Sequence, residues 1–217
     1  SMHALRFRPL YRPIHGAFRV RKTVMPEPLT ALIKQAAREL GFDAVGISRL
    51  PLPSEPPPDQ SPAPPFPRLG DRLKEWLRRG FQASMNWMTR DPERRVDPAL
   101  VMPGCRSIIS VGMNYYTDQR ADEQPGNGRI ARYAWGLDYH TILGNRLTQL
   151  SERITALAPE GRHRAYVDTG PVMEKAWAQQ AGLGWIGKHS NLVSPQFGSW
   201  LLLGEILTTL ELDPDEA

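Results

Sequence analysis

The chain has 217 residues, of which 41% are hydrophobic and 23% are charged, so it is long enough to bury a core, and its composition excludes a fibrous or disordered protein. The single cysteine, Cys105, excludes an intrachain disulfide and a cysteine-ligated cluster, and it favours a reducing, cytoplasmic setting. The longest apolar stretch, residues 200–207, is interrupted by Gly204 and Glu205 and is far shorter than the roughly 20 residues of a membrane helix. We therefore expect no membrane span.

The positive charge is concentrated at the start of the chain. The net charge is +4, but residues 1–25 hold six basic and no acidic residues, so the remainder has 21 basic and 23 acidic residues and a net charge of −2. We expect residues 1–25 to form a flexible basic extension, residues 26–212 to form the folded domain, and 213–217 to be its C-terminal end. The extension could be a transit-like arm, a phosphate-binding arm or upstream translated sequence without a role, and we favour the last.

Hydrophobic periodicity predicts the first elements of the domain. Apolar residues over 29–40 follow the 3.6-residue period of a helix, and Gly41 is placed to end it. Residues 42–47 predict a strand that is buried on both faces. Nine of the seventeen residues 51–67 are proline, which favours a surface loop, with a proline-rich ligand for a partner as the alternative. A second helix is predicted over residues 71–80.

The later elements alternate between strands and helices. They are predicted as a central strand over 107–113, a glycine-rich polar loop over 118–128, a long amphipathic helix over 142–157, a short strand ending at 166–167, a helix over 171–181 and two strands within 191–208 joined at 195–198. Pro171 suits the first position of its helix, and Gly182 suits the end.

Several common chemistries lack their residues. The chain has no G-x-G-x-x-G after a strand, no G-x-x-x-x-G-K-[ST] and no G-x-S-x-G, which removes support for common nucleotide-binding and hydrolase functions. Its five histidines show no H-E-x-x-H spacing, which argues against a zinc enzyme. Residues 138–144 come within one residue of the D-x-H-x-x-G pattern by which some proteins ligate cobalamin. His140 equally fits a plain polar residue near the start of a helix.

Asp168 is the strongest catalytic candidate from residue chemistry. It follows a short apolar strand and precedes Thr-Gly-Pro and a helix, a position where a carboxyl group can face a cleft at a strand end. In a partly desolvated cleft the neutral acid is favoured and can donate a proton. A turn or capping aspartate is the alternative that chemistry alone leaves open.

A set of ordered segments around Asp168 resembles the epoxyqueuosine reductases. The segments are Val-Asp-Thr-Gly-Pro at 167–171, Glu174, Ala-Gly-Leu-Gly-Trp-Ile-Gly-Lys-His-Ser at 181–190, Gly-Ser-Trp at 198–200 and Leu-Gly-Glu at 203–205. Upstream, residues 92–98, 107–114 and 133–140 continue the likeness, which covers roughly residues 28–212.

The resemblance implies the last step of queuosine synthesis. In this step the epoxide of epoxyqueuosine in a tRNA anticodon loop is reduced to an alkene and its oxygen leaves as water, with cobalamin and 4Fe-4S clusters as cofactors. The implied fold is α+β, a central and mostly antiparallel sheet flanked by helices, similar to the flavin-reductase, nitroreductase and cobalamin-processing domains. The family's catalytic aspartate, the proton donor to the epoxide oxygen, falls on Asp168.

The same resemblance implies a cobalamin site without a lower histidine ligand. By motif position its contacts are Arg95, Tyr139, His140, Asp168, Met173, Lys188, His189, Ser190 and Leu192. Arg95 or Lys188 could meet the phosphate of the nucleotide tail. A core role for Met173, a solvated charge at Lys188 and a turn at Gly184 remain the plain alternatives. Lys175 stands where the family usually has arginine, which keeps the charge but loses the planar fork.

One departure affects the expected activity. The family continues into a ferredoxin-like domain with C-x2-C-x2-C-x3-C-P clusters and then into helical repeats, whereas this chain ends at Ala217 and carries no ligands for a cluster. We therefore expect a truncated catalytic part that takes electrons from a missing or external donor, is not competent for full turnover, binds tRNA weakly and is a cytoplasmic monomer. The alternatives are another cobalamin-dependent reductase related to reductive dehalogenases, a non-catalytic cobalamin carrier or processing protein, and a flavin-binding nitroreductase-like module.

Overall fold

The computed structural model describes residues 28–50, 65–120 and 124–217. The expected basic extension over 1–25 and most of the expected proline-rich loop lie outside these ranges. Within them, no helix combines the length and the hydropathy that crossing a bilayer requires.

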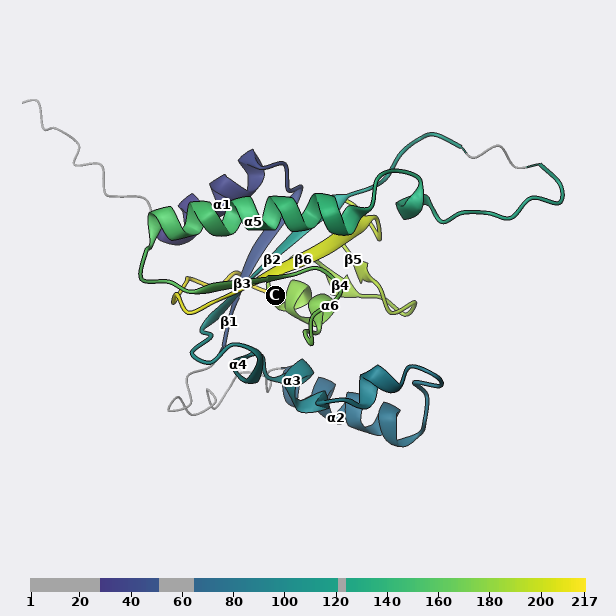
Figure 1. Ribbon diagram of the computed structural model, residues 1–217, viewed down its shortest axis with the longest axis horizontal. Coiled ribbons are helices and arrows are strands. Elements are labelled where there is room, and N and C mark those ends of the chain that lie inside the picture. Colours follow the sequence, from purple (N-terminus) through teal and green to yellow (C-terminus); the bar gives the residue numbers. More distant parts are fainter. Residues whose placement is uncertain (1–27, 51–64, 121–123) are drawn as a thin grey trace, which may run out of the picture.

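A four-stranded antiparallel sheet forms the centre of the fold (Figure 1). Its order is β1 (Ala44–Arg49), β2 (Ser107–Asn114), β6 (Leu201–Thr208) and β3 (His163–Tyr166), and every neighbouring pair is antiparallel. The fold is therefore α+β with an antiparallel sheet between helices, as expected. The apolar run at 107–113 lies in an inner strand, as predicted.

Two helices, α1 (Leu29–Glu39) and α5 (Tyr139–Leu157), cover one face of the sheet (Figure 1). The predicted stripe of α5 is buried through Leu143, Leu147, Leu150 and Ile154, which are fully inaccessible. Leu157 was expected on the same stripe, but it is exposed because it is the last residue of the helix. α1 and the strands complete this core with Ile33, Ala36, Ala37, Ile47, Ile109, Val111 and Ile206.

The opposite face is covered by α6 (Glu174–Gln180), which also packs against a small sheet of β4 (Trp185–Ile186) and β5 (Leu192–Val193). Trp177 of α6 is buried with Val172, Ile108 and Leu207. The helix begins at Glu174 rather than at the predicted Pro171. Val172 packs into this core ahead of the helix, and Met173 has a non-helical backbone.

Four short or peripheral helices lie between β1 and β2 in the chain, and a fifth lies between β2 and α5. They are α2 (Pro65–Arg78), η1 (Asn86–Thr89), α3 (Pro92–Val96), α4 (Pro98–Val101) and, after β2, η2 (Arg132–Ala134). The loop that carries η2 extends away from the sheet (Figure 1).

Two further predicted boundaries and one strand pairing were wrong. α2 starts six residues before Asp71, because prolines at 65 and 67 occupy the first helical turn, where the missing N–H groups have no partner to lose. The first strand starts at Ala44, two residues later than predicted, since Phe42 and Asp43 form the turn after α1. The two strands within 191–208 exist, but β5 pairs with β4 and β6 joins the central sheet.

Gly46 on β1 provides a test of the packing of α6 on the sheet. A Cβ atom at this position would lie 2.0 Å from the backbone carbonyl oxygen of Ala181 and 2.6 Å from Leu183 Cδ1. We expect Gly46→Ala to lower the free energy of unfolding by about 2–3 kcal/mol in urea denaturation. The control is Gly144→Ala in α5, where an added Cβ meets nothing within 4 Å, and it should gain up to about 1 kcal/mol. Unchanged stability of Gly46→Ala would contradict this packing.

Candidate active site

Asp168 lies in a tight turn directly after β3. Its backbone is left-handed at φ 53°, a conformation that is rare for a non-glycine residue and that often occurs at functional sites. The next glycine, Gly170, lies against the ring of Tyr166, where an added Cβ would be 2.3 Å from Cδ1. This turn leaves the Asp168 side chain 54% exposed, so its carboxyl group is open to a ligand.

The start of α5 brings two predicted site residues onto Asp168. The Tyr139 hydroxyl donates a hydrogen bond to Asp168 Oδ2, and His140 Nε2 is 3.6 Å from the same oxygen. The imidazole of His140 stacks on the Tyr139 ring at 4.1 Å, and its Nδ1 is 2.8 Å from Asp138 Oδ1. Burial and the neighbouring Asp168 raise the pKa of Tyr139, so its hydroxyl stays protonated and remains a donor. Three of the residues predicted from the sequence therefore form one cluster.

Two further carboxyl groups lie behind Asp168. Burial, with a smaller contribution from Asp168, raises the pKa of Glu174 at the start of α6 to about 7. Glu205 on β6 is fully buried, and neither of its carboxylate oxygens has a hydrogen-bond partner among the described residues. Burial first, then Glu174 and Asp168, raise the pKa of Glu205 well above its ordinary value. Burial thus favours the neutral form of Glu205, since an unpaired buried carboxylate would cost several kcal/mol.

The state of Glu205 predicts how stability depends on pH. Because its pKa is raised in the fold, the folded chain keeps a proton that the unfolded chain loses above about pH 4.5. The wild type should therefore lose stability as the pH rises above that value. Glu205→Gln has no such proton to lose, so it should be increasingly more stable than the wild type between pH 5 and pH 8 in urea denaturation. A variant that is less stable at pH 8 would mean that Glu205 is a paired carboxylate.

A cavity of about 250 Å³ adjoins the Asp168 cluster and is mostly apolar. Its lining residues are Tyr115, Tyr133, Tyr139, Lys175, Asn191, Leu192, Ser199, Leu201, Leu202 and Leu203. Tyr139 connects it to Asp168. Lys175 Nζ donates to the Ser190 carbonyl oxygen at 3.0 Å and to Asn191 Oδ1 at 2.9 Å, which fixes the loop after β4 against α6.

The loop after β4 holds three of the predicted contacts. His189 Nε2 is 2.8 Å from Ser199 Oγ, and Ser190 has a left-handed backbone at φ 63°. Gly187 lets His189 fold back, because an added Cβ would be 2.6 Å from the imidazole. Lys188 is exposed, and Leu192 is buried in β5 with its side chain lining the cavity.

Arg95 and Met173 are the two predicted contacts outside the segments described so far. The Arg95 guanidinium lies 5.0 Å from the centre of the Trp87 ring and lowers the pKa of Glu174, so its charge acts on this carboxyl group. Met173 is the N-cap residue of α6, next to Glu174. Neither Arg95 nor Met173 lines the apolar cavity.

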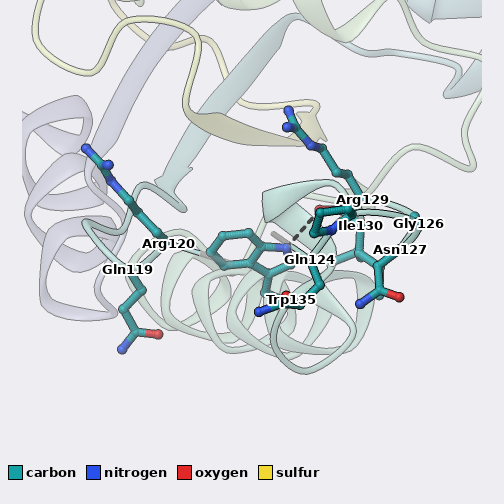
Figure 2. A pocket seen from close by; sticks show the side chains of 11 residues that line it. Gln119, Arg120, Gln124, Gly126, Asn127, Arg129, Ile130 and Trp135 are labelled. Atoms are coloured by element: carbon teal, nitrogen blue, oxygen red, sulfur yellow. Dashed lines mark hydrogen bonds between the residues drawn. The ribbon is translucent and has the colours of Figure 1, made fainter. Parts of the chain in front are cut away.

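Another cavity lies elsewhere, in the loop between β2 and α5 (Figure 2). It measures about 800 Å³ and is lined by loop backbone, Arg120, Arg129 and Trp135, whose indole N–H donates to the Ile130 carbonyl oxygen at 2.8 Å. Its lining contains no histidine, cysteine or carboxyl group. The cluster of Asp168, Tyr139 and His140 does not contribute to this lining.

Sequence reasoning assigned no role to Glu174 and Glu205 as titrating groups. The signal for Glu205 was present, because a single charged residue interrupts an apolar strand. Strand pairing is needed to place it near Asp168. The described residues contain no group of three or more histidine, cysteine or acidic side chains that could hold a metal ion.

Comparisons of sequence identify relatives. A family model described as "Epoxyqueuosine reductase QueG, DUF1730" matches residues 95–169. An epoxyqueuosine reductase of Gloeobacter violaceus is 48% identical over 190 residues, which are 87% of this chain and 54% of that protein. One from a Synechococcus strain is 44% identical over 190 residues, 86% of this chain and 54% of that protein. The chain therefore spans about half the length of the curated relatives that it matches.

Solved structures share the fold. Epoxyqueuosine reductase from Streptococcus thermophilus has a TM-score of 0.72 and 29% identity, covering 86% of this chain and 47% of that one. An epoxyqueuosine reductase with an epoxyqueuosine-modified tRNA stem loop also has a TM-score of 0.72, with 26% identity over 87% of this chain and 47% of that one. A B12-dependent reductive dehalogenase shares the fold at a TM-score of 0.51 and 17% identity, over 85% of this chain and 20% of that one. The resemblance is thus confirmed: this chain is a relative of the epoxyqueuosine reductases that corresponds to about half of their length.

Proposed function

We propose that this chain is the catalytic part of an enzyme that reduces epoxyqueuosine in tRNA to queuosine. The observation that carries the proposal is the cluster of Asp168, Tyr139 and His140 at the edge of an apolar cavity. An exposed acid beside an apolar wall suits proton donation to a leaving oxygen. The relatives share this half of the enzyme with the chain at 44–48% identity.

The residues around this cavity suit one part of a cobalamin, whose corrin ring is larger than the cavity of about 250 Å³ and would extend beyond it. The apolar wall formed by Leu192 and 201–203 suits the face of a corrin ring, and the hydroxyl, amide and ammonium groups of the same lining suit its amide side chains. Cobalamin would supply electrons to the epoxide carbon. The cobalamin contacts named from the sequence remain a prediction.

The chain's own residues hold and deliver a proton. Tyr139 donates to Asp168 Oδ2, so Oδ1 is the oxygen through which Asp168 would give a proton to the epoxide oxygen. His140 packs against both residues and limits the rotation of the Asp168 side chain. Lys175 holds the Ser190–Asn191 backbone in place beside the cavity.

We propose that the RNA contacts the loop between β2 and α5. This loop extends from the body of the fold (Figure 1) and carries Arg120, Arg129 and Trp135 (Figure 2). It also carries Arg132, whose guanidinium lies 5.4 Å from the centre of the Trp135 ring. Arginine beside exposed aromatic rings suits phosphate contacts and base stacking. The net charge of −2 outside residues 1–25 predicts weak, salt-sensitive binding by this chain alone.

We also propose that the complete enzyme carries iron–sulfur clusters and takes electrons from a donor, and that the protein is a cytoplasmic monomer. The test of the main activity therefore replaces the donor by a chemical reductant. The chain is mixed with cobalamin, titanium(III) citrate and an RNA stem loop that contains epoxyqueuosine, and the nucleoside is analysed by mass spectrometry. We expect product that has lost one oxygen atom. Cobalamin binding without this product would contradict the proposed reaction and favour a cobalamin carrier.

The reductive dehalogenase fold supports one alternative. A halogenated aromatic compound can replace the RNA in the same assay, and release of halide instead of RNA reduction would favour this alternative. The likeness to flavin reductases and nitroreductases is tested by the cofactor itself, since flavin absorbance in the purified chain would support it.

A further inference from the structure

Arg132, on the single turn η2, lies among three aromatic rings. Its guanidinium carbon is 4.9 Å from the centre of the Trp200 ring and 5.4 Å from the centres of the Tyr116 and Trp135 rings. All three distances are within the roughly 6 Å at which a cation is attracted to the face of an aromatic ring. Arg132 is therefore held by three ring contacts at once.

Two of these rings belong to the ends of sheet strands rather than to the loop. Trp200 directly precedes β6, and its carbonyl oxygen accepts a hydrogen bond of 2.9 Å from the Tyr115 amide. Tyr116 lies two residues after β2, and its amide donates to Asn114 Oδ1 at 3.0 Å. The Trp200 ring meets both tyrosine rings edge-on, at 5.5 Å from Tyr115 and 5.3 Å from Tyr116. These contacts form a platform at the paired ends of β2 and β6, and Arg132 joins η2 to it.

The residue after Arg132 reaches the candidate site. Tyr133 lines the cavity beside Asp168, and its ring lies edge-on to the Tyr139 ring with the ring centres 6.0 Å apart. The Tyr133 side chain is 49% exposed, so it depends on η2 for its position. Tyr139 in turn donates to Asp168 Oδ2. A continuous series of contacts thus leads from Arg132 through Tyr133 and Tyr139 to the Asp168 carboxyl group.

We propose that Arg132 is a positioning residue for the reaction at Asp168, a role that rests on the proposed function. By joining η2 to the platform it holds Tyr133 against Tyr139, and so keeps the Tyr139 hydroxyl on the carboxyl group. Arg132 then affects the rate of proton delivery more than the affinity for RNA. A guanidinium lies flat on a ring, whereas the ammonium group of lysine is a compact, strongly hydrated charge, so Arg132→Lys keeps the charge and loses most of the stacking.

Hydrogen exchange of the chain without cofactor or RNA tests the first half of the proposal. The amides of Ala134 and Trp135 donate to the carbonyl oxygens of Ala131 and Arg132, at 2.9 and 3.2 Å, so their exchange reports whether η2 is held in place. We expect Arg132→Lys to speed their exchange about fivefold and to leave exchange in the buried stripe of α5 unchanged. The control Arg120→Lys, on the same loop, should change neither. Unchanged exchange at Ala134 and Trp135 in Arg132→Lys would overturn the proposal whether or not the chain reduces RNA.

The reductant-driven assay tests the second half. For Arg132→Lys we expect kcat to fall about fivefold and KM for the RNA to change by less than about twofold. The loss of rate should not exceed that of Tyr139→Phe, because Arg132 acts only through the Tyr139 hydroxyl. A raised KM with an unchanged kcat would show that Arg132 contacts the RNA instead. That result would overturn the positioning role and leave the proposed function intact.

A double-variant cycle tests whether Arg132 acts through Tyr133. Tyr133→Leu keeps an apolar wall but removes the ring that contacts Tyr139. The kcat of the double variant with Arg132→Lys should equal that of Tyr133→Leu alone within about twofold, since residues in one series of contacts have coupled effects. Losses of kcat that multiply in the double variant would show that the two residues act independently, and would overturn the proposal.

Discussion

Replacement of Asp168 by asparagine is expected to lower the rate of epoxide reduction by at least about a hundredfold, the usual contribution of a positioned general acid. Asparagine keeps the shape and can still accept the hydrogen bond from Tyr139, but it has no acidic proton to give to the leaving oxygen. Cobalamin affinity should therefore be nearly unchanged. The measurements are product formation with a chemical reductant and a cobalamin titration of the same variant.

The control for this substitution is Asp71→Asn on α2, an exposed aspartate outside the cluster. It should match the wild type in both measurements. If Asp168→Asn forms product at the wild-type rate, Asp168 is not the proton donor. If it loses cobalamin binding as well, Asp168 is a cofactor contact first, and its role as an acid would need separate evidence.

Tyr139→Phe is expected to have the next largest effect. The variant keeps the ring that stacks on His140 but removes the donor to Asp168 Oδ2. The carboxyl group can then rotate. A hydrogen bond between two neutral groups contributes about 0.5–1.5 kcal/mol, so we expect the rate to fall by up to about tenfold.

Tyr115→Phe is the matched control for this prediction. Tyr115 lines the same cavity, but its hydroxyl donates only a long hydrogen bond, 3.4 Å, to the Ser199 carbonyl oxygen. It should change the rate less than threefold. Equal losses in the two variants would show that the cavity needs tyrosine hydroxyls in general rather than the contact between Tyr139 and Asp168.

The periodic parts of the fold could be predicted from the sequence. The buried stripe of α5 and the apolar run of β2 were correct because one strong pattern extends over many residues. The start of α2 was missed because proline is read as a helix breaker, although it is tolerated in a first turn. The pairing of β5 with β4 was missed because strands of two residues carry no pattern.

Only those residues of the candidate site that lie in a local sequence motif could be predicted. Asp168 was identified from its place after a strand and from its resemblance to a family, and the structure adds the contacts with Tyr139 and His140. The pair Glu174 and Glu205 could not be placed, because the two residues are 31 positions apart and meet only through the packing of α6 on β6. Burial, which decides their charge, is a property of the folded chain.

A titration of the chain with cobalamin tests the central claim most directly. We expect saturable binding of one cobalamin per chain, quenching of tryptophan fluorescence and an absorption spectrum of the Co(II) form without a nitrogen ligand on the lower face. The same result with Asp168→Asn would separate binding from catalysis. Absence of saturable binding by a folded chain, or a spectrum with a histidine ligand, would contradict a corrin site in the cavity beside Asp168.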